Sequence, residues 1–98
     1  MVPASRPIGP ETSVVAVTRQ VSVDLGEEVL ILHLSTAGYY SVRNVAARIW
    51  HLLGSPIRVS EIAATLAGEY GVPPERCEAD VLELLADLVD RDLVKVLA

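Results

Sequence analysis

The 98-residue sequence contains no phenylalanine, and aromatic residues make up only 4% of it. A hydrophobic core must therefore be built from valine, leucine, isoleucine and alanine, because hydrophobic residues still account for 51% of the chain. Charged residues reach only 21%, which is typical of a globular protein and not of a disordered one. The length suits a single domain with a thin but workable aliphatic core.

Cysteine occurs once, as Cys77, so the chain cannot form an internal disulfide, which is usual in a reducing compartment. No apolar run approaches the roughly 18 residues that indicate a membrane span. Residues 1–13 hold three prolines and no apolar segment of the signal-peptide kind. These features predict a cytoplasmic protein with a flexible segment at 1–13 and one domain at 14–98.

Basic residues are the scarcer charge, since eight lysines and arginines face 13 aspartates and glutamates and the net charge is −5. An acidic chain gains nothing from counterion release on nucleic acid, and anionic membrane surfaces repel it. The charge therefore argues against nucleic-acid and membrane partners.

The residues that carry most enzyme chemistry are also few. The histidines are His33 and His51, and neither has a spacing to Cys77 that suggests a nucleophile with its base or a metal site. The six glycines are scattered and form no phosphate-binding loop. The sequence thus predicts no enzyme, no cofactor and no metal, with Cys77 a small buried hydrophobic residue.

Three segments have the patterns of strands. Residues 15–25 alternate between apolar and polar, but Arg19 interrupts the apolar face, which leaves two short strands or one bulged strand possible. Residues 29–34 are almost continuously apolar, as in a strand flanked on both sides. Residues 39–42, which follow a turn at Gly38, form a short third strand at the edge of the sheet.

Three helices are predicted after the strands. The first begins after Asn44 as its cap and ends at Gly54, and the second begins after Ser60 and ends at Gly71. The third begins at Pro73 and Pro74 and runs to about Arg91. The apolar stripes of the first two helices are Val45, Ile49, Trp50 and Leu53, and Ile62, Ala63, Leu66, Ala67 and Tyr70. The tail from Leu93 packs back on the domain or adds a short strand.

This order predicts an α+β fold in which a three-stranded antiparallel sheet is followed by three helices. The short connection "GVPP" between the last two helices fits a helix-turn-helix, so the whole is winged helix-turn-helix-like. DNA binding nevertheless looks unfavourable. The third helix, which would be the recognition helix, carries many acidic residues from Glu75 to Asp92 and only Arg76 and Arg91 as basic ones.

A binding module for peptides or proteins fits better, because the third helix has an unusually wide apolar arc. Seven residues share it on a helical wheel: Cys77, Val81, Leu82, Leu84, Leu85, Leu88 and Val89. The arc spans roughly 160°, more than the roughly 100° that seats a helix on a core. Its excess either packs on the first two helices or lines a groove beside the sheet. Asp80 borders the arc, either as a solvated residue or as a contact for a cationic group.

The third strand supports the groove interpretation. Its sequence "YYSV" has no lysine, proline or charge of the kind that protects edge strands. Such an edge can accept an extended peptide as an additional strand. Alternation places Tyr40 and Val42 toward the helices and Tyr39 on the opposite face.

The segments "GYYSVRNVAARIWHLL" and "VSEIAATLAGEYGVPPERCEADVLELLADLVDRDLV" resemble the PqqD family. The resemblance rests on the Gly-x-Tyr strand, the Asn cap, the Ile-Trp pair, "Val-x-Glu-Ile" and "Glu-Ala-Asp-Val", and it runs from about Val21 to Val94. The family often has glycine where this chain has Asp92, and Cys77 is not a characteristic position.

The resemblance implies a domain that recognises the leader segment of a ribosomal precursor peptide (a RiPP recognition element). The leader would add as a strand to the third strand and lie over the third helix. The implied binding residues are Tyr39, Tyr40, Ser41, Val42, Cys77, Asp80, Val81 and Leu84. The greatest similarity is to the separate leader-binding proteins of lasso-peptide biosynthesis, which deliver the precursor to a leader protease and a macrocyclase. A peptide chaperone of pyrroloquinoline quinone or another pathway, and a winged-helix DNA-binding protein, remain the alternatives.

Overall fold

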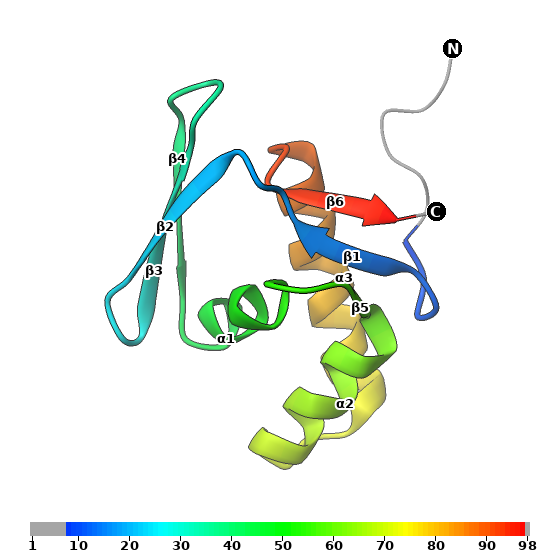
Figure 1. Cartoon of the computed structure of the whole chain (residues 1–98). Coiled ribbons are helices and arrows are strands. Elements are labelled where there is room, and N and C mark those ends of the chain that lie inside the picture. Colours follow the sequence, from blue (N-terminus) through cyan, green and yellow to red (C-terminus); the bar gives the residue numbers. More distant parts are fainter. Residues whose placement is uncertain (1–7, 98) are drawn as a thin grey trace.

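A computed structural model describes residues 8–97 of the chain. It contains six strands and three helices (Figure 1). In chain order these are β1 (Ser13–Ala16), β2 (Gln20–Asp24), β3 (Glu28–His33), β4 (Tyr39–Arg43), α1 (Val45–Leu52), β5 (Ile57–Arg58), α2 (Val59–Tyr70), α3 (Pro74–Asp90) and β6 (Val94–Leu97). The predicted α+β class is confirmed, with two small sheets in place of one.

The first sheet has the order β2-β3-β4 and is antiparallel. The predicted middle strand is confirmed as its centre, and the predicted edge strand is β4. Alternate residues of β3 are buried, including Val29 and Ile31, while Leu32 faces solvent. One face of this sheet therefore packs on the helices, as the alternation requires.

The second sheet, in the order β5-β1-β6, was not predicted as such. The segment 15–25 divides between the two sheets, because the chain leaves β1 after Ala16 and enters β2 at Gln20. Strand β1 pairs with the C-terminal strand β6. Directly after β1, the Val17 N–H donates to the Leu93 carbonyl at 3.0 Å. The tail thus adds a strand, one of the two outcomes that its sequence allowed.

The segment before β1 is also tied to the domain. The Val59 N–H donates to the Thr12 carbonyl, and the Ser60 N–H donates to the Pro10 carbonyl. Pro10 and Thr12, which lie in the predicted flexible segment, are therefore hydrogen-bonded to the start of α2. The rest of the predicted flexible segment, residues 1–7, lies outside the described residues.

Two predicted helix caps work differently from the prediction. Helix α2 begins at Val59, directly after β5, so Ser60 lies inside it and the cap position is Arg58, whose N–H donates to Glu61 Oε1 at 2.9 Å. Asn44 does precede α1, but its side chain makes no capping bond. It instead has φ of 55°, a left-handed conformation that asparagine tolerates better than most residues. Gly71, with φ of 67°, ends α2 as predicted.

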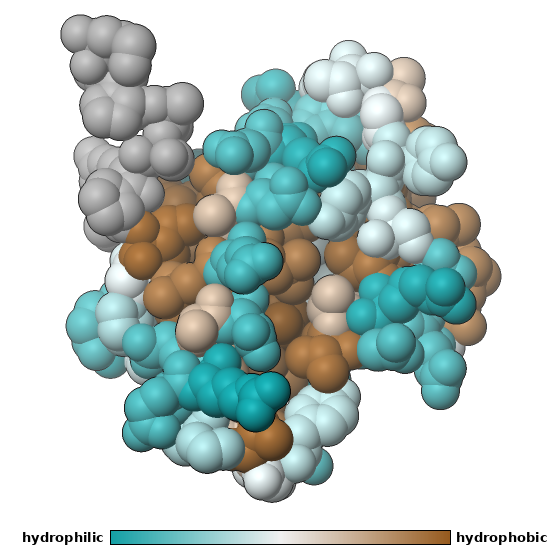
Figure 2. Space-filling view, turned by 180° about the vertical axis from the view of Figure 1, so that it is seen from behind, coloured by the Kyte–Doolittle hydropathy of each residue, from teal (hydrophilic) through white to brown (hydrophobic). Residues whose placement is uncertain are grey.

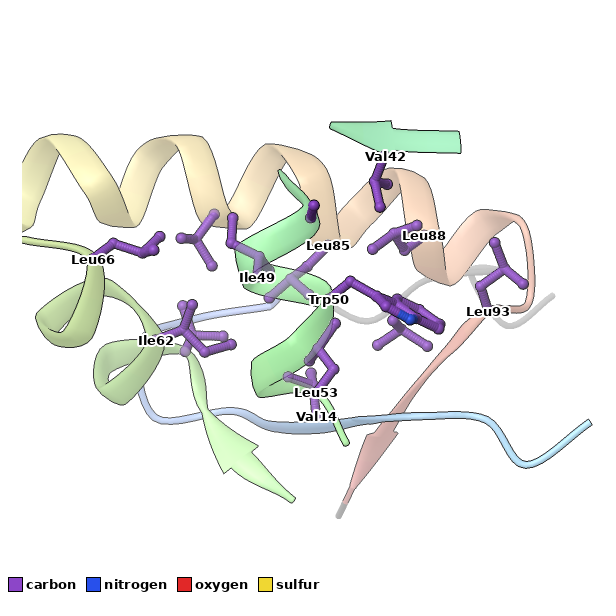
Figure 3. Close-up of a cluster of buried hydrophobic side chains, with 14 of the residues drawn as sticks. Val14, Val42, Ile49, Trp50, Leu53, Ile62, Leu66, Leu85, Leu88 and Leu93 are labelled. Carbon is purple, nitrogen blue, oxygen red and sulfur yellow. The ribbon is translucent and has the colours of Figure 1, made fainter. Parts of the chain in front are cut away.

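The core lies between the helices and the inner faces of both sheets. Val42 of β4 points into the same cluster as Leu88 of α3 and Trp50 of α1, and Leu85 lies beside them (Figure 3). The indole N–H of Trp50 donates to Ser22 Oγ at 3.1 Å, so the one large aromatic of the core has its polar atom satisfied. Helix α3 therefore shares this cluster with β4 and α1.

We expect Leu85→Ala to lower the free energy of unfolding by about 2–5 kcal/mol, since it removes buried methyl groups and leaves a cavity. Leu85 is fully buried in α3. Denaturant unfolding followed by circular dichroism measures the change. A loss below about 1 kcal/mol would contradict this description of the core. The exposed Ala86→Gly, which acts only through helix propensity, is the comparison.

The position of Asp92, where the sequence departs from the family pattern, is explained by a contact across the domain. Asp92 has φ of 58°, the conformation that glycine favours after a helix. Its carboxylate accepts a hydrogen bond from Nε2 of the buried His33 at 3.0 Å. His33 Nδ1 in turn accepts the Ser35 N–H, which assigns the proton to Nε2. A polar contact therefore accompanies the strained backbone at the end of α3.

Candidate functional site

The outer edge of β4 is unpaired. In the sheet order β2-β3-β4, only one side of β4 has a neighbouring strand among residues 8–97. The first and last strands of the described chain, β1 and β6, do not cover it, because they pair with each other in the second sheet. Tyr39, Ser41 and Arg43 are exposed along this edge. An edge of this kind can accept another strand.

The pairing register shows which main-chain groups are free. The Asn44 N–H donates to the Glu27 carbonyl and the His33 N–H donates to the Gly38 carbonyl, so these are hydrogen-bonded pairs of the β3–β4 ladder. Such pairs alternate along an antiparallel ladder. The backbone N–H and C=O groups of Tyr40 and Val42 therefore face β3. The same groups of Tyr39, Ser41 and Arg43 face the open edge. Tyr40 of the sequence-predicted site can thus contribute its side chain but no edge hydrogen bond, and Val42 is buried in the core.

Helix α3 forms the second wall of a groove beside β4. A hollow of about 410 Å³ is lined by Tyr40 of β4 and by Asp80, Glu83, Leu84 and Asp87 of α3. Leu84 is half-buried and presents an apolar surface to the hollow, whereas Asp80 and Glu83 are exposed. Neither of these two carboxylates has an ion-pair or hydrogen-bond partner within the described part of the chain. The groove therefore combines an apolar wall with a negatively charged rim.

The remaining predicted site residues lie deeper. Val81 is fully buried and Cys77 is 7% exposed, so both belong to the core under the groove. The wide apolar arc of α3 is divided accordingly. Its centre (Cys77, Val81, Leu85 and Leu88) is buried, and its flanks (Leu82, Leu84 and Val89) are half-buried. Only the flank at Leu84 opens onto the hollow beside β4.

A polar cluster connects the two walls. The Tyr40 hydroxyl donates to Asp87 Oδ2 at 2.6 Å, and Arg91 Nε donates to Asp87 Oδ1 at 3.2 Å. The hydrogen bond to Asp87, assisted by burial, raises the pKa of Tyr40 above its ordinary value. The same bond, assisted by Arg91, lowers the pKa of Asp87. Both shifts favour a neutral tyrosine and a charged aspartate at neutral pH.

A second hollow, of about 320 Å³, continues from Asp80 toward the N-terminal end of α3. It is mainly apolar and lies among all three helices. It is lined by Val45, Ile49, Leu66, Tyr70, Val72, Arg76, Cys77 and Asp80. Sequence reasoning assigned Val45 and Tyr70 to buried stripes, yet they are 39% and 50% exposed. Two apolar residues left uncovered beside one hollow mark it as a place where an apolar side chain of a ligand could bind.

The histidines and the cysteine have separate surroundings. His33 bonds Asp92, His51 pairs with Asp24 at 2.9 Å on the exposed surface, and Cys77 lies in the core. The structure does not bring the three together. Within residues 8–97, no group of three or more His, Cys, Asp or Glu side chains is arranged to hold a metal ion.

The exposed surface is mixed. Figure 2 shows hydrophobic surface lying between groups of polar and charged residues on the side opposite to the view of Figure 1. None of the helices in the described part of the chain has the length and hydropathy needed to cross a membrane.

A free strand edge beside an apolar helix wall defines a class of domain that recognises extended peptides. Comparisons with known proteins agree with that class. The family model described as "Coenzyme PQQ synthesis protein D (PqqD)" matches residues 28–94. A search of curated protein sequences finds no match.

Two solved structures are similar to the chain. One is described as "TbiB1 in Complex with the TbiA(beta) Leader Peptide". It has 32% sequence identity and a TM-score of 0.77, with 86% of this chain and 98% of that chain covered. The other, "Lasso peptide synthetase B1 complexed with the leader peptide", has 18% identity and a TM-score of 0.74, with 84% and 96% covered. At that identity the second structure shows a shared fold only.

The chain belongs to the PqqD family, since the family model covers more than half of it. It is accordingly a RiPP recognition element, a non-catalytic binding module of ribosomal-peptide modification pathways. The sequence resemblance and the prediction that the chain is no enzyme are both confirmed by this match.

Proposed function

We propose that this domain binds the leader segment of a ribosomal precursor peptide by adding it as a strand to the free edge of β4. The observation that carries the proposal is the open edge of β4 beside the groove wall of α3. TbiB1, which is 32% identical to the chain over most of its length, has been solved with a leader peptide bound.

The residues of the groove divide the work of recognition. The N–H and C=O groups of Tyr39, Ser41 and Arg43 supply hydrogen bonds that do not depend on the peptide sequence. Leu84 receives an apolar side chain, and Asp80 meets a polar or basic group. Because peptide residues alternate between faces, every second side chain points toward α3. Val81, Cys77 and Val42 lie in the core behind this surface. The side chain of Tyr40 lines the hollow.

A synthetic peptide with the leader sequence of the cognate precursor is expected to bind saturably, with one peptide per chain. Isothermal titration calorimetry measures the affinity, which we expect to be micromolar or tighter, about −8 kcal/mol or more favourable. A scrambled peptide of the same composition is the control. Equal heats from both peptides would contradict sequence-selective leader binding.

Amide hydrogen exchange locates the bound peptide. The proposal expects slower exchange at Tyr39, Ser41 and Arg43 in the complex, because their N–H groups become hydrogen-bonded. The amides of β2, at the other edge of the same sheet, serve as the internal reference. Protection at β2 alone, or at neither edge, would place the peptide elsewhere and exclude strand addition to β4.

The finer assignment that we propose is delivery of the precursor to a leader protease and a macrocyclase in lasso-peptide biosynthesis. The support is the resemblance of the sequence to the separate leader-binding proteins of those pathways. The test is reconstitution with a leader protease and a macrocyclase of the proposed lasso-peptide pathway. Leader cleavage should accelerate when the domain is added, and the core peptide should lose one water as a ring-closing amide forms.

A second pathway has an observation in its favour. The matching family model is described by coenzyme PQQ synthesis, which suits a peptide chaperone of that pathway. In that case the domain would bind its precursor equally well, and the reconstituted lasso enzymes would gain nothing from it. The two readouts, leader affinity and product mass, therefore separate the binding function from the pathway.

A further inference from the structure

Three side chains join the two walls of the groove into a closed cluster. Tyr40 lies on β4, Asp87 in the last turns of α3, and Arg91 directly after that helix. Asp87 binds both of the others, through its two carboxylate oxygens. The Arg91 guanidinium carbon also lies 4.4 Å from the centroid of the Tyr40 ring, which closes the triangle. Each residue thus touches the other two.

The cluster holds β4 against α3 in a way that apolar packing does not. The bond between Tyr40 and Asp87 is the one side-chain hydrogen bond between β4 and α3 in the part of the chain that the structure describes. Val42 packs into the core close to α3, but van der Waals contact is non-directional. A hydrogen bond has a narrow range of length and angle, so the cluster fixes the lateral position of the strand relative to the helix.

Tyr40 also lies between two hollows of the groove. One, of about 210 Å³, is lined by Tyr39, Tyr40, Arg91 and Leu93 among others, and the other is the hollow at Asp80 and Leu84. Since Arg91 stacks on the tyrosine ring, the ring is held in one orientation as the shared wall. The cluster therefore fixes both the spacing of β4 from α3 and the surface on each side of Tyr40.

We propose that Tyr40, Asp87 and Arg91 are positioning residues for peptide binding. They hold β4 and α3 at the separation at which a chain paired with β4 also places its inward side chains on Leu84. This inference rests on the proposed leader binding and adds the device that prepares the groove for it. A groove fixed before binding loses less conformational entropy when the peptide arrives, which raises affinity.

Tyr40→Phe tests the proposal with the smallest change, because it keeps the ring and removes only the hydroxyl. We expect the leader affinity to fall about tenfold, with a melting temperature within a few degrees of the wild type, because the bond is partly exposed. Asp87→Ala should lose a similar factor. Asp87→Asn should lose less than Asp87→Ala, since its amide oxygen still accepts the tyrosine proton although its NH2 group cannot accept from Arg91.

The matched control is Glu69→Gln. Glu69 pairs with Arg48 at 2.7 Å on another part of the surface, so this change also separates an arginine from a surface carboxylate. Its expected effect on leader affinity is less than twofold. The double variant Tyr40→Phe with Asp87→Ala should be no weaker than either single variant, because both remove the same interaction.

Alkaline titration followed by tyrosine absorbance reports the cluster without the peptide. Tyr40, one of three tyrosines, should ionise at a higher pH in the wild type than in Asp87→Ala, since the bond to Asp87 raises its pKa.

A structural role unrelated to the groove would leave leader affinity unchanged in Tyr40→Phe, and that result would overturn the inference while leader binding by the wild type stands. The inference would also be overturned if leader affinity fell only at temperatures at which the variant is already partly unfolded. If the wild type fails to bind the leader, the proposed function falls, and the inference falls with it.

Discussion

Leu84→Asp is expected to weaken leader binding by at least about 100-fold, or about 2.7 kcal/mol. The half-buried Leu84 is the apolar residue that α3 presents to the hollow beside β4. A carboxylate in its place would have to lose water when the peptide covers it, with no cation to compensate. It would also stand among Asp80, Glu83 and Asp87, so a wall that is apolar in the wild type would become part of an acidic surface.

The comparison variant is Ala86→Asp, which adds the same charge on an exposed position of the same helix. It is expected to bind the leader within about twofold of the wild type, because surface substitutions away from an interface have small effects. Calorimetry gives both affinities, and circular dichroism shows that α3 remains folded in each protein. Equal losses in the two variants would mean that helix charge, and not the groove wall, determines binding. Unchanged affinity in Leu84→Asp would remove the groove from the proposal.

The part of the fold that is local in sequence could be predicted, and the part that depends on distant pairing could not. The strand at 29–34 and the edge strand beginning at Tyr39 were identified because burial on one or both faces imposes its own pattern. The break at Arg19 in the alternation of residues 15–25 allows two short strands, but it does not show that they belong to different sheets. Only the pairing of β1 with β6, from the opposite end of the chain, reveals the change of sheet.

The candidate site divides in the same way. Periodicity placed Leu84 in the wide apolar arc of α3, and the structure shows that it lies on the flank that opens onto the groove. Periodicity also assigned Tyr70 to a buried stripe, although half of its surface is exposed. A helical stripe shows which side of a helix faces the core. It does not show how far the neighbouring element extends along that side, so a residue near the end of the stripe can stay exposed. The contact between Tyr40 and Asp87 joins residues 47 positions apart, and no local pattern predicts it.

Ser41→Pro is the variant that tests strand addition itself, and it is expected to weaken leader binding by about 30-fold or more. The alternation of the β3–β4 ladder directs the Ser41 N–H toward the open edge. Proline removes that donor, which costs about 1 kcal/mol, and its ring occupies the place that the added strand must approach. Since the lost N–H bonds no neighbour within the sheet, the domain is expected to remain folded.

Gln20→Pro at the other edge of the same sheet is the matched control. Val21 and Val23 form the hydrogen-bonded pairs of the β2–β3 ladder, as the Leu25 N–H to Glu28 carbonyl bond shows by alternation, so the Gln20 N–H also points outward. The two variants therefore make the same chemical change at opposite edges. If the leader adds to β4, Ser41→Pro lowers leader affinity and Gln20→Pro does not. The peptide-dependent protection of the Tyr39 and Arg43 amides is then lost only in Ser41→Pro. Equal affinities for the two proline variants would contradict strand addition to β4, because an added strand would lose the Ser41 donor and meet the proline ring only at that edge.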